Sequence, residues 1–165
     1  MGGQVKRRSL VSVDLGKRVA GIAFFRDAVL VDARELRTTP GRMAALLLSQ
    51  GIAFDPSARW AAEQMKHYAG KGGRRRDLEQ LEDLAAALAK GARAAGGTYR
   101  GIPASRWIGG LPKAIAHARI LGALTPEELD LFVDRTKESM DAVGIGLYTE
   151  GRTSRGVVLT KGGLS

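Results

Sequence analysis

Three carboxylates stand where an acidic side chain is costly unless a cation or hydrogen bonds accompany it. Asp14 ends an apolar segment rich in β-branched residues, and Glu63 lies inside the short apolar segment 59–65. Asp141 directly precedes the apolar run 142–147, which must pack against other elements. Because an unpaired charge in apolar surroundings is strongly unfavourable, these positions point to cation binding.

Carboxylates drawn from two strands and one helix suit a hard divalent cation such as Mg²⁺, which prefers oxygen ligands. Two such ions about 4 Å apart can activate a water and stabilise the leaving oxygen during phosphodiester hydrolysis. Simpler roles remain open for each residue taken alone. Asp14 could end its strand or cap a turn, and Glu63 could pair with a nearby arginine.

Two more acidic residues, Asp134 and Glu138, precede Asp141. The three residues are spaced by four and three positions, so they are expected to share one face of a helix. Like charges on one face repel, so the arrangement favours a bound cation. For Asp134 itself we favour a solvated surface charge, whereas Asp141 lies where the helix enters the core.

The elements that must position these residues form a mixed α/β pattern. Alternating, β-branched segments separated by short turns predict an antiparallel meander of three strands over 9–15, 19–25 and 28–36. Further strands are expected at 59–65 and 98–102, although a helical turn remains an alternative for the former. The fold class is therefore α/β, with a mixed five-stranded sheet flanked by helices.

Helices are expected between and after these strands. They are predicted from Thr39-Pro40-Gly41 to about Gly51, over 77–95, over 113–121, after a capping-box motif at 125–128, and over 135–148. The segment 66–76 is expected to be a basic, glycine-rich loop, and 103–110 is expected to be irregular. The leucine stripe within 78–88 is most simply core.

Composition narrows the classes of partner. The 165 residues fit one domain spanning 1–165, with short basic ends, and carry a formal net charge of +9. Such an excess favours a polyanionic partner, either nucleic acid or an anionic membrane surface. No apolar run approaches the roughly 18 residues that cross a bilayer, and the basic start is not expected to be a signal peptide.

Cysteine is absent, which excludes disulfides, thiolate zinc sites and a cysteine nucleophile. A reducing, cytoplasmic location fits this composition. His67 and His117 lack metal-ligand spacing, so both are expected to be structural or surface residues.

The order of these acidic segments resembles the RNase H-like nucleases, and the motifs resemble the RuvC-type Holliday junction resolvases. Ser-Val-Asp-Leu-Gly at 12–16 with Ala-Gly-Ile-Ala at 20–23 is similar to their opening hairpin. Glu-Gln-Met at 63–65 resembles their Glu-Gln segment, and Glu-Ser-Met-Asp-Ala at 138–142 resembles their final acidic pair. The resemblance covers about residues 9–148, and its short, drifted motifs suggest a divergent member, of the kind a bacteriophage encodes.

The resemblance implies a Mg²⁺-dependent crossover junction endodeoxyribonuclease, with Mn²⁺ as a substitute. Its metal ligands and catalytic residues would be Asp14, Glu63, Glu138 and Asp141. Its partners would be branched DNA, such as four-way junctions, and a second copy of the chain, because the resolvase helix that corresponds to 78–88 contributes to a homodimer interface.

Basic residues near Glu63 and in the later segments could hold DNA phosphates, although charge runs are often simply solvated. The DNA-binding candidates are Lys66, Tyr68, Lys71, Arg74, Arg75, Arg76, Arg106 and Lys113. Tyr68 could stack on an unpaired base, but it lies two residues later than the aromatic of the family. The family's lysine-rich segment has only Arg106 and Lys113 as counterparts. The basic ends, including Arg152, could be phosphate contacts or solvated residues.

Three other functions remain as alternatives. A RuvC-like RNA-processing nuclease shares the opening hairpin, but the segment around Glu63 and the acidic helix fit the resolvases better. A nucleic-acid-binding module without catalysis could keep the same fold. An actin-like ATPase fragment also begins with an Asp-x-Gly hairpin, but 165 residues leave no room for its second domain.

Overall fold

The computed structural model describes residues 8–64, 72–154 and 157–159, and the fold is built on one five-stranded sheet. Its order is β3-β2-β1-β4-β5, so the strand that carries Asp14 lies at the centre. The first three strands form the predicted antiparallel meander, and the last two run parallel to β1. The strands are β1 (Ser9–Asp14), β2 (Val19–Arg26), β3 (Val29–Arg37), β4 (Arg59–Gln64) and β5 (Thr98–Pro103).

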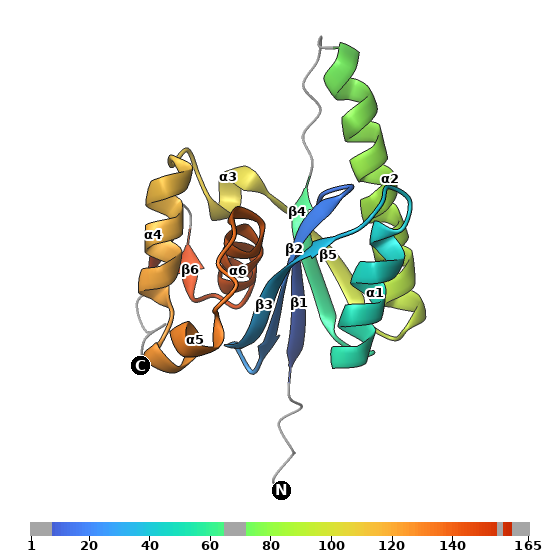
Figure 1. Ribbon diagram of the computed structural model, residues 1–165. Helices are drawn as coiled ribbons and strands as arrows, with labels where there is room; N and C mark the ends of the chain where they lie inside the picture. The colour runs from blue at the N-terminus through green and yellow to red at the C-terminus, as the bar shows by residue number, and fades with distance from the viewer. Residues whose placement is uncertain (1–7, 65–71, 155–156, 160–165) are drawn as a thin grey trace, which may run out of the picture.

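Helices cover both faces of the sheet (Figure 1). One face carries α1 (Met43–Phe54) and α2 (Gly72–Ala94). The other face carries α3 (Ala104–Trp107), α4 (Lys113–Ala123), α5 (Pro126–Leu131) and α6 (Lys137–Thr149). A short hairpin of β6 (Thr153–Ser154) and β7 (Val158–Leu159) follows. Within the described parts of the chain, no helix has the length and apolar character of a membrane span.

The alternation of side chains along the strands divides the interior into two hydrophobic cores. Leu10, Ala61 and Ile102 face α6 and its neighbours, whereas Val11 and Trp60 face α1 and α2. A sheet covered on both faces explains why β1 is buried from Ser9 to Val13. The leucine stripe of α2 joins the second core, as predicted. Leu88 is fully buried in this core, and Leu81, Leu84 and Ala85 are partly buried against the core.

Two glycines let α6 approach its neighbours closely, Gly146 on the side of the sheet and Gly144 on the side of α3. A Cβ atom at Gly146 would lie 2.1 Å from the Phe25 ring, and one at Gly144 would lie 2.6 Å from the Trp107 ring. The Ser12 hydroxyl on β1 donates a hydrogen bond of 2.7 Å to the Ala142 carbonyl oxygen. The start of α6 is thereby fixed directly over the central strand.

Two predicted helix starts were wrong. The last helix begins at Lys137 rather than at residue 135, because Thr136 is its N-cap and forms a capping box with Ser139. The expected loop 66–76 is also shorter than predicted, since α2 already begins at Gly72.

Two further boundaries differ from the prediction. The helix α1 continues past Gly51 to Phe54, because Gly51 makes room for the Trp60 ring rather than ending the helix. The segment 103–110, expected to be irregular, contains the short helix α3.

The predicted capping box at Thr125 and Glu128 is confirmed at the start of α5. The Glu128 carboxylate is buried and also accepts a hydrogen bond from the backbone N–H of Leu30. The guanidinium of Arg152 binds both carboxylate oxygens and donates to the carbonyl oxygens of Ala28 and Ala123. Arg152 is therefore an internal structural residue, and both roles considered for it, phosphate contact and solvated end, were wrong.

Candidate functional site

The candidate site lies at the end of β1, where strand pairing and one glycine bring the acidic segments together. Gly21 on β2 pairs with Asp14 on β1. A Cβ atom at residue 21 would lie 1.9 Å from the backbone oxygen of Glu138, so only glycine lets the first turn of α6 come this close. The site is completed from β4, where Ala62 pairs with Val13 and places Glu63 alongside Asp14.

Burial and like charges act together on Asp14. Its pKa is raised from 3.8 to about 8, first by burial and then by the charges of Asp141 and Glu63, with a smaller contribution from Glu138. The positive charge of Lys113 acts in the opposite direction. A carboxyl in this position ionises readily only when additional positive charge is supplied.

Glu63 is held by a tryptophan that lies far from it in the sequence. The indole Nε1–H of Trp107 donates a hydrogen bond of 3.1 Å to Glu63 Oε1. Burial raises the pKa of Glu63, while the Trp107 hydrogen bond and the charge of Lys113 act to lower it. The indole is itself buried, so it fixes the direction of the carboxylate.

Asp141 is the most deeply buried of the four carboxylates, with an exposed fraction of 3 %. Lys113 Nζ donates to its Oδ2 at 2.6 Å, and His117 Nε2 lies 2.8 Å from its Oδ1. The two partners are four residues apart on α4 and therefore share one helix face. Sequence analysis missed His117, and the i, i+4 spacing of two nitrogen-bearing side chains is the signal that could have found it.

Two more acidic residues lie near Glu138. Glu35 on β3 pairs with Gly21, and its carboxylate accepts a hydrogen bond of 2.7 Å from Arg37 Nε, which lowers its pKa. Sequence analysis missed Glu35, because its strand is too polar to mark any single carboxylate. Asp134 lies before α6, so the face predicted for Asp134, Glu138 and Asp141 was wrong. It is exposed and accepts a hydrogen bond from the backbone N–H of Glu35, as a surface residue can.

The donor set suits a hard cation, but the side chains do not form a ready-made cage. Among the described residues, no three acidic or histidine side chains converge as metal ligands. Asp141 instead contacts Lys113 and His117, and Glu63 contacts Trp107. Oxygen donors around a carboxyl as destabilised as Asp14 match the chemistry of Mg²⁺, and Asp141 would have to leave its nitrogen partners to bind it.

The predicted basic residues fall into three groups. Arg106 and Arg76 are exposed, on α3 and in the early part of α2, and Lys113 contacts Asp141. Arg74, Arg75 and Arg76 belong to α2 by their backbone, so their placement in a loop was wrong. Lys66, Tyr68 and Lys71 lie outside the described residues.

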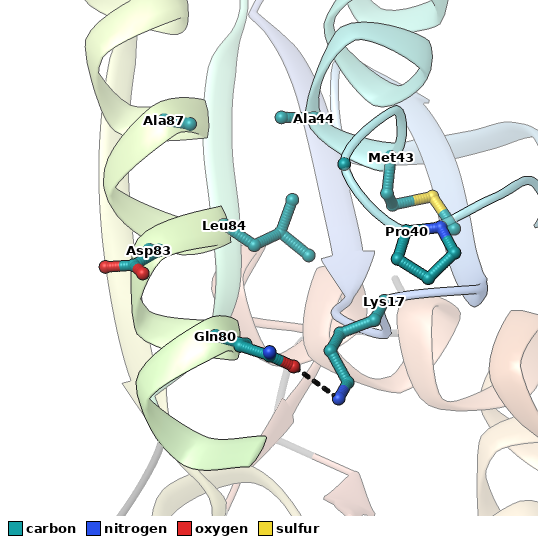
Figure 2. Close-up of a pocket in the computed structure, with 9 residues that line it drawn as sticks. Lys17, Pro40, Met43, Ala44, Gln80, Asp83, Leu84 and Ala87 are labelled. Atoms are coloured by element: carbon teal, nitrogen blue, oxygen red, sulfur yellow. Dashed lines mark hydrogen bonds between the residues drawn. The ribbon is translucent and has the colours of Figure 1, made fainter. Parts of the chain in front are cut away.

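A cleft of about 340 Å³ lies between α1 and α2, on the face of the sheet opposite to α6 (Figure 2). Lys17, on the turn after β1, donates hydrogen bonds to Asp77 at 2.7 Å and to Gln80 at 2.6 Å. None of the four predicted carboxylates is among the described lining residues, which come from the turn at Lys17, from the start of α1 and from α2. Lys17 therefore ties the turn that follows Asp14 to α2, and this cleft is separate from the acidic site.

The strand order and the antiparallel meander, with carboxylates gathered at the end of the central strand, are those of an RNase H-like fold, as predicted. Two solved structures that this chain resembles are structures of RuvC. One is T. thermophilus RuvC in complex with a Holliday junction substrate, with a TM-score of 0.58, 17% identity, and coverage of 86% of this chain and 91% of that one.

A second similar structure is Thermus thermophilus RuvC, with a TM-score of 0.60, 17% identity, and coverage of 85% of this chain and 92% of that one. No protein-family model matches the sequence, and no curated protein is similar to it. The likeness therefore defines the fold over most of the length of both proteins.

Proposed function

We propose that this chain is a metal-dependent endonuclease that cleaves Holliday junctions and other branched DNA by phosphodiester hydrolysis. The observation that carries the proposal is the state of Asp14, a half-buried carboxyl whose pKa is raised to about 8 by burial and by Asp141, Glu63 and Glu138. Such an arrangement lowers stability when no cation is bound and is typical of functional sites. The RuvC fold of the chain and the Holliday junction bound in one similar structure support the choice of substrate.

Mg²⁺, with Mn²⁺ as a substitute, would be held by Asp14, Glu63, Glu138 and Asp141. A bound divalent ion would supply an activated water and stabilise the departing oxygen. The protein's own part is to orient the ligands: Trp107 fixes Glu63, and the close contact at Gly21 fixes the first turn of α6 beside Asp14.

The DNA would be held by the positive charge around this site. Lys113 touches Asp141 while nearly half of its side chain is exposed, so its ammonium group can also approach a phosphate. Arg106 and Arg76 are exposed and available for backbone contacts, and Lys66, Tyr68, Lys71, Arg74 and Arg75 complete the proposed set. Sequence-independent affinity of this kind fits the net charge of +9.

Two further points belong to the proposal. Residues 1–165 would act as one nuclease domain, and two copies would assemble into a homodimer, because a two-fold enzyme suits paired cuts in a four-way junction. Its place of action would be the cytoplasm of a bacterial cell or of a phage-infected host.

The substitution Asp14→Asn tests the proposed role of the carboxylates. It should reduce cleavage of a labelled junction in Mg²⁺ by at least about a hundredfold, as expected when a catalytic electrostatic group is lost. Junction binding measured in EDTA should be preserved or improved, since a negative charge is removed. Asp130→Asn, at an exposed position on α5, is the matched control and should cut normally.

If Asp14→Asn weakens binding and cleavage together, Asp14 is a structural residue. If it cuts as well as the wild type, Asp14 is not a metal ligand.

A nucleic-acid-binding module without catalysis is the second candidate. The observation that favours it is the double contact of Asp141 with Lys113 and His117, which leaves neither carboxylate oxygen without a nitrogen partner. Tight junction binding with no cleavage in either Mg²⁺ or Mn²⁺ would establish this alternative. Cleavage restricted to RNA would instead identify an RNA-processing nuclease.

A further inference from the structure

Another cavity, of about 580 Å³, opens on the face of the sheet that α6 covers. The edge strand β5 contributes Arg100, which pairs with Ala61 and lies two residues before the buried Ile102, so its side chain leaves the strand on that face. The described lining residues come from β5, α3, α6 and β6; they are Arg100, Ser105, Arg106, Tyr148, Thr153 and Ser154.

The charge of this cavity is uncompensated. Arg100 and Arg106 are both exposed. Neither guanidinium group makes a hydrogen bond or ion pair with any residue that the structure describes. No carboxylate stands among the described lining residues. Glu150, which follows α6, is already paired with Arg59 at the start of β4. Two guanidinium groups without acidic partners on one cavity wall favour an anion, and their planar donor sets match the oxygens of a phosphate.

Hydroxyl groups supply a second, independent indication. Thr153 is 3 % exposed, and its Oγ1 has no hydrogen-bond partner in the structure. A buried hydroxyl is normally satisfied, so an unpartnered one at the wall of a cavity indicates a missing ligand or water. Ser105 is an exposed donor on the same wall.

The geometry points to a phosphate-binding site in this cavity, formed by Arg100 and Arg106 with the hydroxyls of Thr153 and Ser105. Its volume lies within the range of about 300–1,000 Å³ that is typical of small-molecule sites. It therefore has room for a phosphate together with an attached sugar. The occupant we infer is a backbone phosphate of a nucleic-acid strand.

The position of the cavity relative to the acidic site supports a strand over a free anion. Arg106 is adjacent in the chain to Trp107, whose indole binds Glu63. One short helix, α3, thus carries both the phosphate ligand and the residue that orients a proposed metal ligand. In this respect the inference rests on the proposed function: a strand gripped at Arg106 would be held at a fixed distance from the carboxylates.

Direct binding of inorganic phosphate tests the site without any nuclease activity. In a chloride buffer of constant ionic strength, phosphate should cause saturable NMR shifts of the side-chain Nε–Hε signals of Arg100 and Arg106. The double variant R100Q/R106Q should lose saturable binding, whereas Arg93→Gln, an exposed arginine on α2, should keep it. Absence of saturable shifts in the wild type, or equal loss in the Arg93 control, would overturn the site.

Thr153→Val separates a binding role from a structural one. Removing an unpartnered hydroxyl should leave the midpoint of thermal unfolding unchanged or higher. The affinity for phosphate should fall roughly three- to tenfold, the loss expected for one hydrogen bond. A lower unfolding midpoint with unchanged phosphate affinity would show that the hydroxyl serves the fold alone.

Binding of a labelled four-way junction in EDTA then distinguishes a strand phosphate from a free one. For R100Q/R106Q the slope of log K against log salt should fall by about one, because one phosphate contact is lost. Arg93→Gln should leave the slope unchanged. An unchanged slope in the double variant would refute the strand and leave a site for free phosphate. If the wild type binds no junction but still binds phosphate, the proposed function fails and the anion site stands.

Discussion

The substitution Asp14→Asn should stabilise the protein when no metal is present. At pH 7 the folded chain holds a proton on Asp14 that the unfolded chain has lost, because the pKa is about 8 in the fold and 3.8 outside it. Each pH unit in this interval costs about 1.4 kcal/mol, so the penalty at pH 7 is at most about 4 kcal/mol. Partial access of water reduces it, and a gain of about 1–4 kcal/mol is expected for the variant.

The pH dependence has a definite sign. Between pH 4 and 8 the folded state binds more protons at Asp14 than the unfolded state, so the stability of the wild type falls as the pH rises. Asparagine does not titrate. The advantage of the variant should therefore be near zero at pH 4, grow through this window, and become constant above about pH 8.

Urea denaturation in EDTA at a series of pH values measures this difference, with Asp130→Asn as the control. Each kcal/mol should also move the midpoint of thermal unfolding by roughly 2–4 °C in a chain of this length. Added Mg²⁺ should stabilise the wild type more than the variant, since a ligand that binds only the folded state adds stability by mass action. A variant that is less stable at pH 7, or a difference that does not vary with pH, would refute the reasoning.

Two other substitutions test the contacts that place the site. Gly21→Ala puts a Cβ atom 1.9 Å from a backbone oxygen of α6, so it should cost about 1–3 kcal/mol of stability in urea denaturation and most of the cleavage. Gly122→Ala, where the space is open, should be neutral or slightly stabilising, and equal behaviour of the two would contradict the close contact. Glu128→Gln should destabilise the fold by about 3 kcal/mol, because it leaves the Arg152 guanidinium buried without its partner. An unfolding midpoint within a degree or two of the wild type would show that this ion pair is dispensable.

The sequence was sufficient for the features that rest on local patterns. Alternating β-branched residues around Val11 and Val13 predicted β1 and its neighbours, and Thr125 with Glu128 predicted the start of α5. Asp14 and Glu63 could be singled out because an acidic residue stands out within an apolar strand. The RNase H-like fold followed from the order of these elements.

Features that depend on packing could not be predicted in this way. The contacts of Asp141 with Lys113 and His117 exist only because α4 packs beside α6. The i, i+4 spacing of the two nitrogen-bearing side chains does not by itself name Asp141 as their partner. The start of α6 was misplaced because Thr136 caps it through Ser139, a weaker sequence signal than the glutamate of a usual capping box. Arg152 looked like a solvated basic residue until the fold placed it against Glu128.

The most direct test of the account is cleavage of a labelled four-way junction beside a matched duplex and a matched RNA, each with Mg²⁺, Mn²⁺ or EDTA. We expect paired nicks near the crossover of the junction in either metal, no cutting in EDTA, and little cutting of the duplex or the RNA. Junction binding without cleavage under any of these conditions would contradict it and would mean that the four carboxylates around Asp14 do not catalyse hydrolysis.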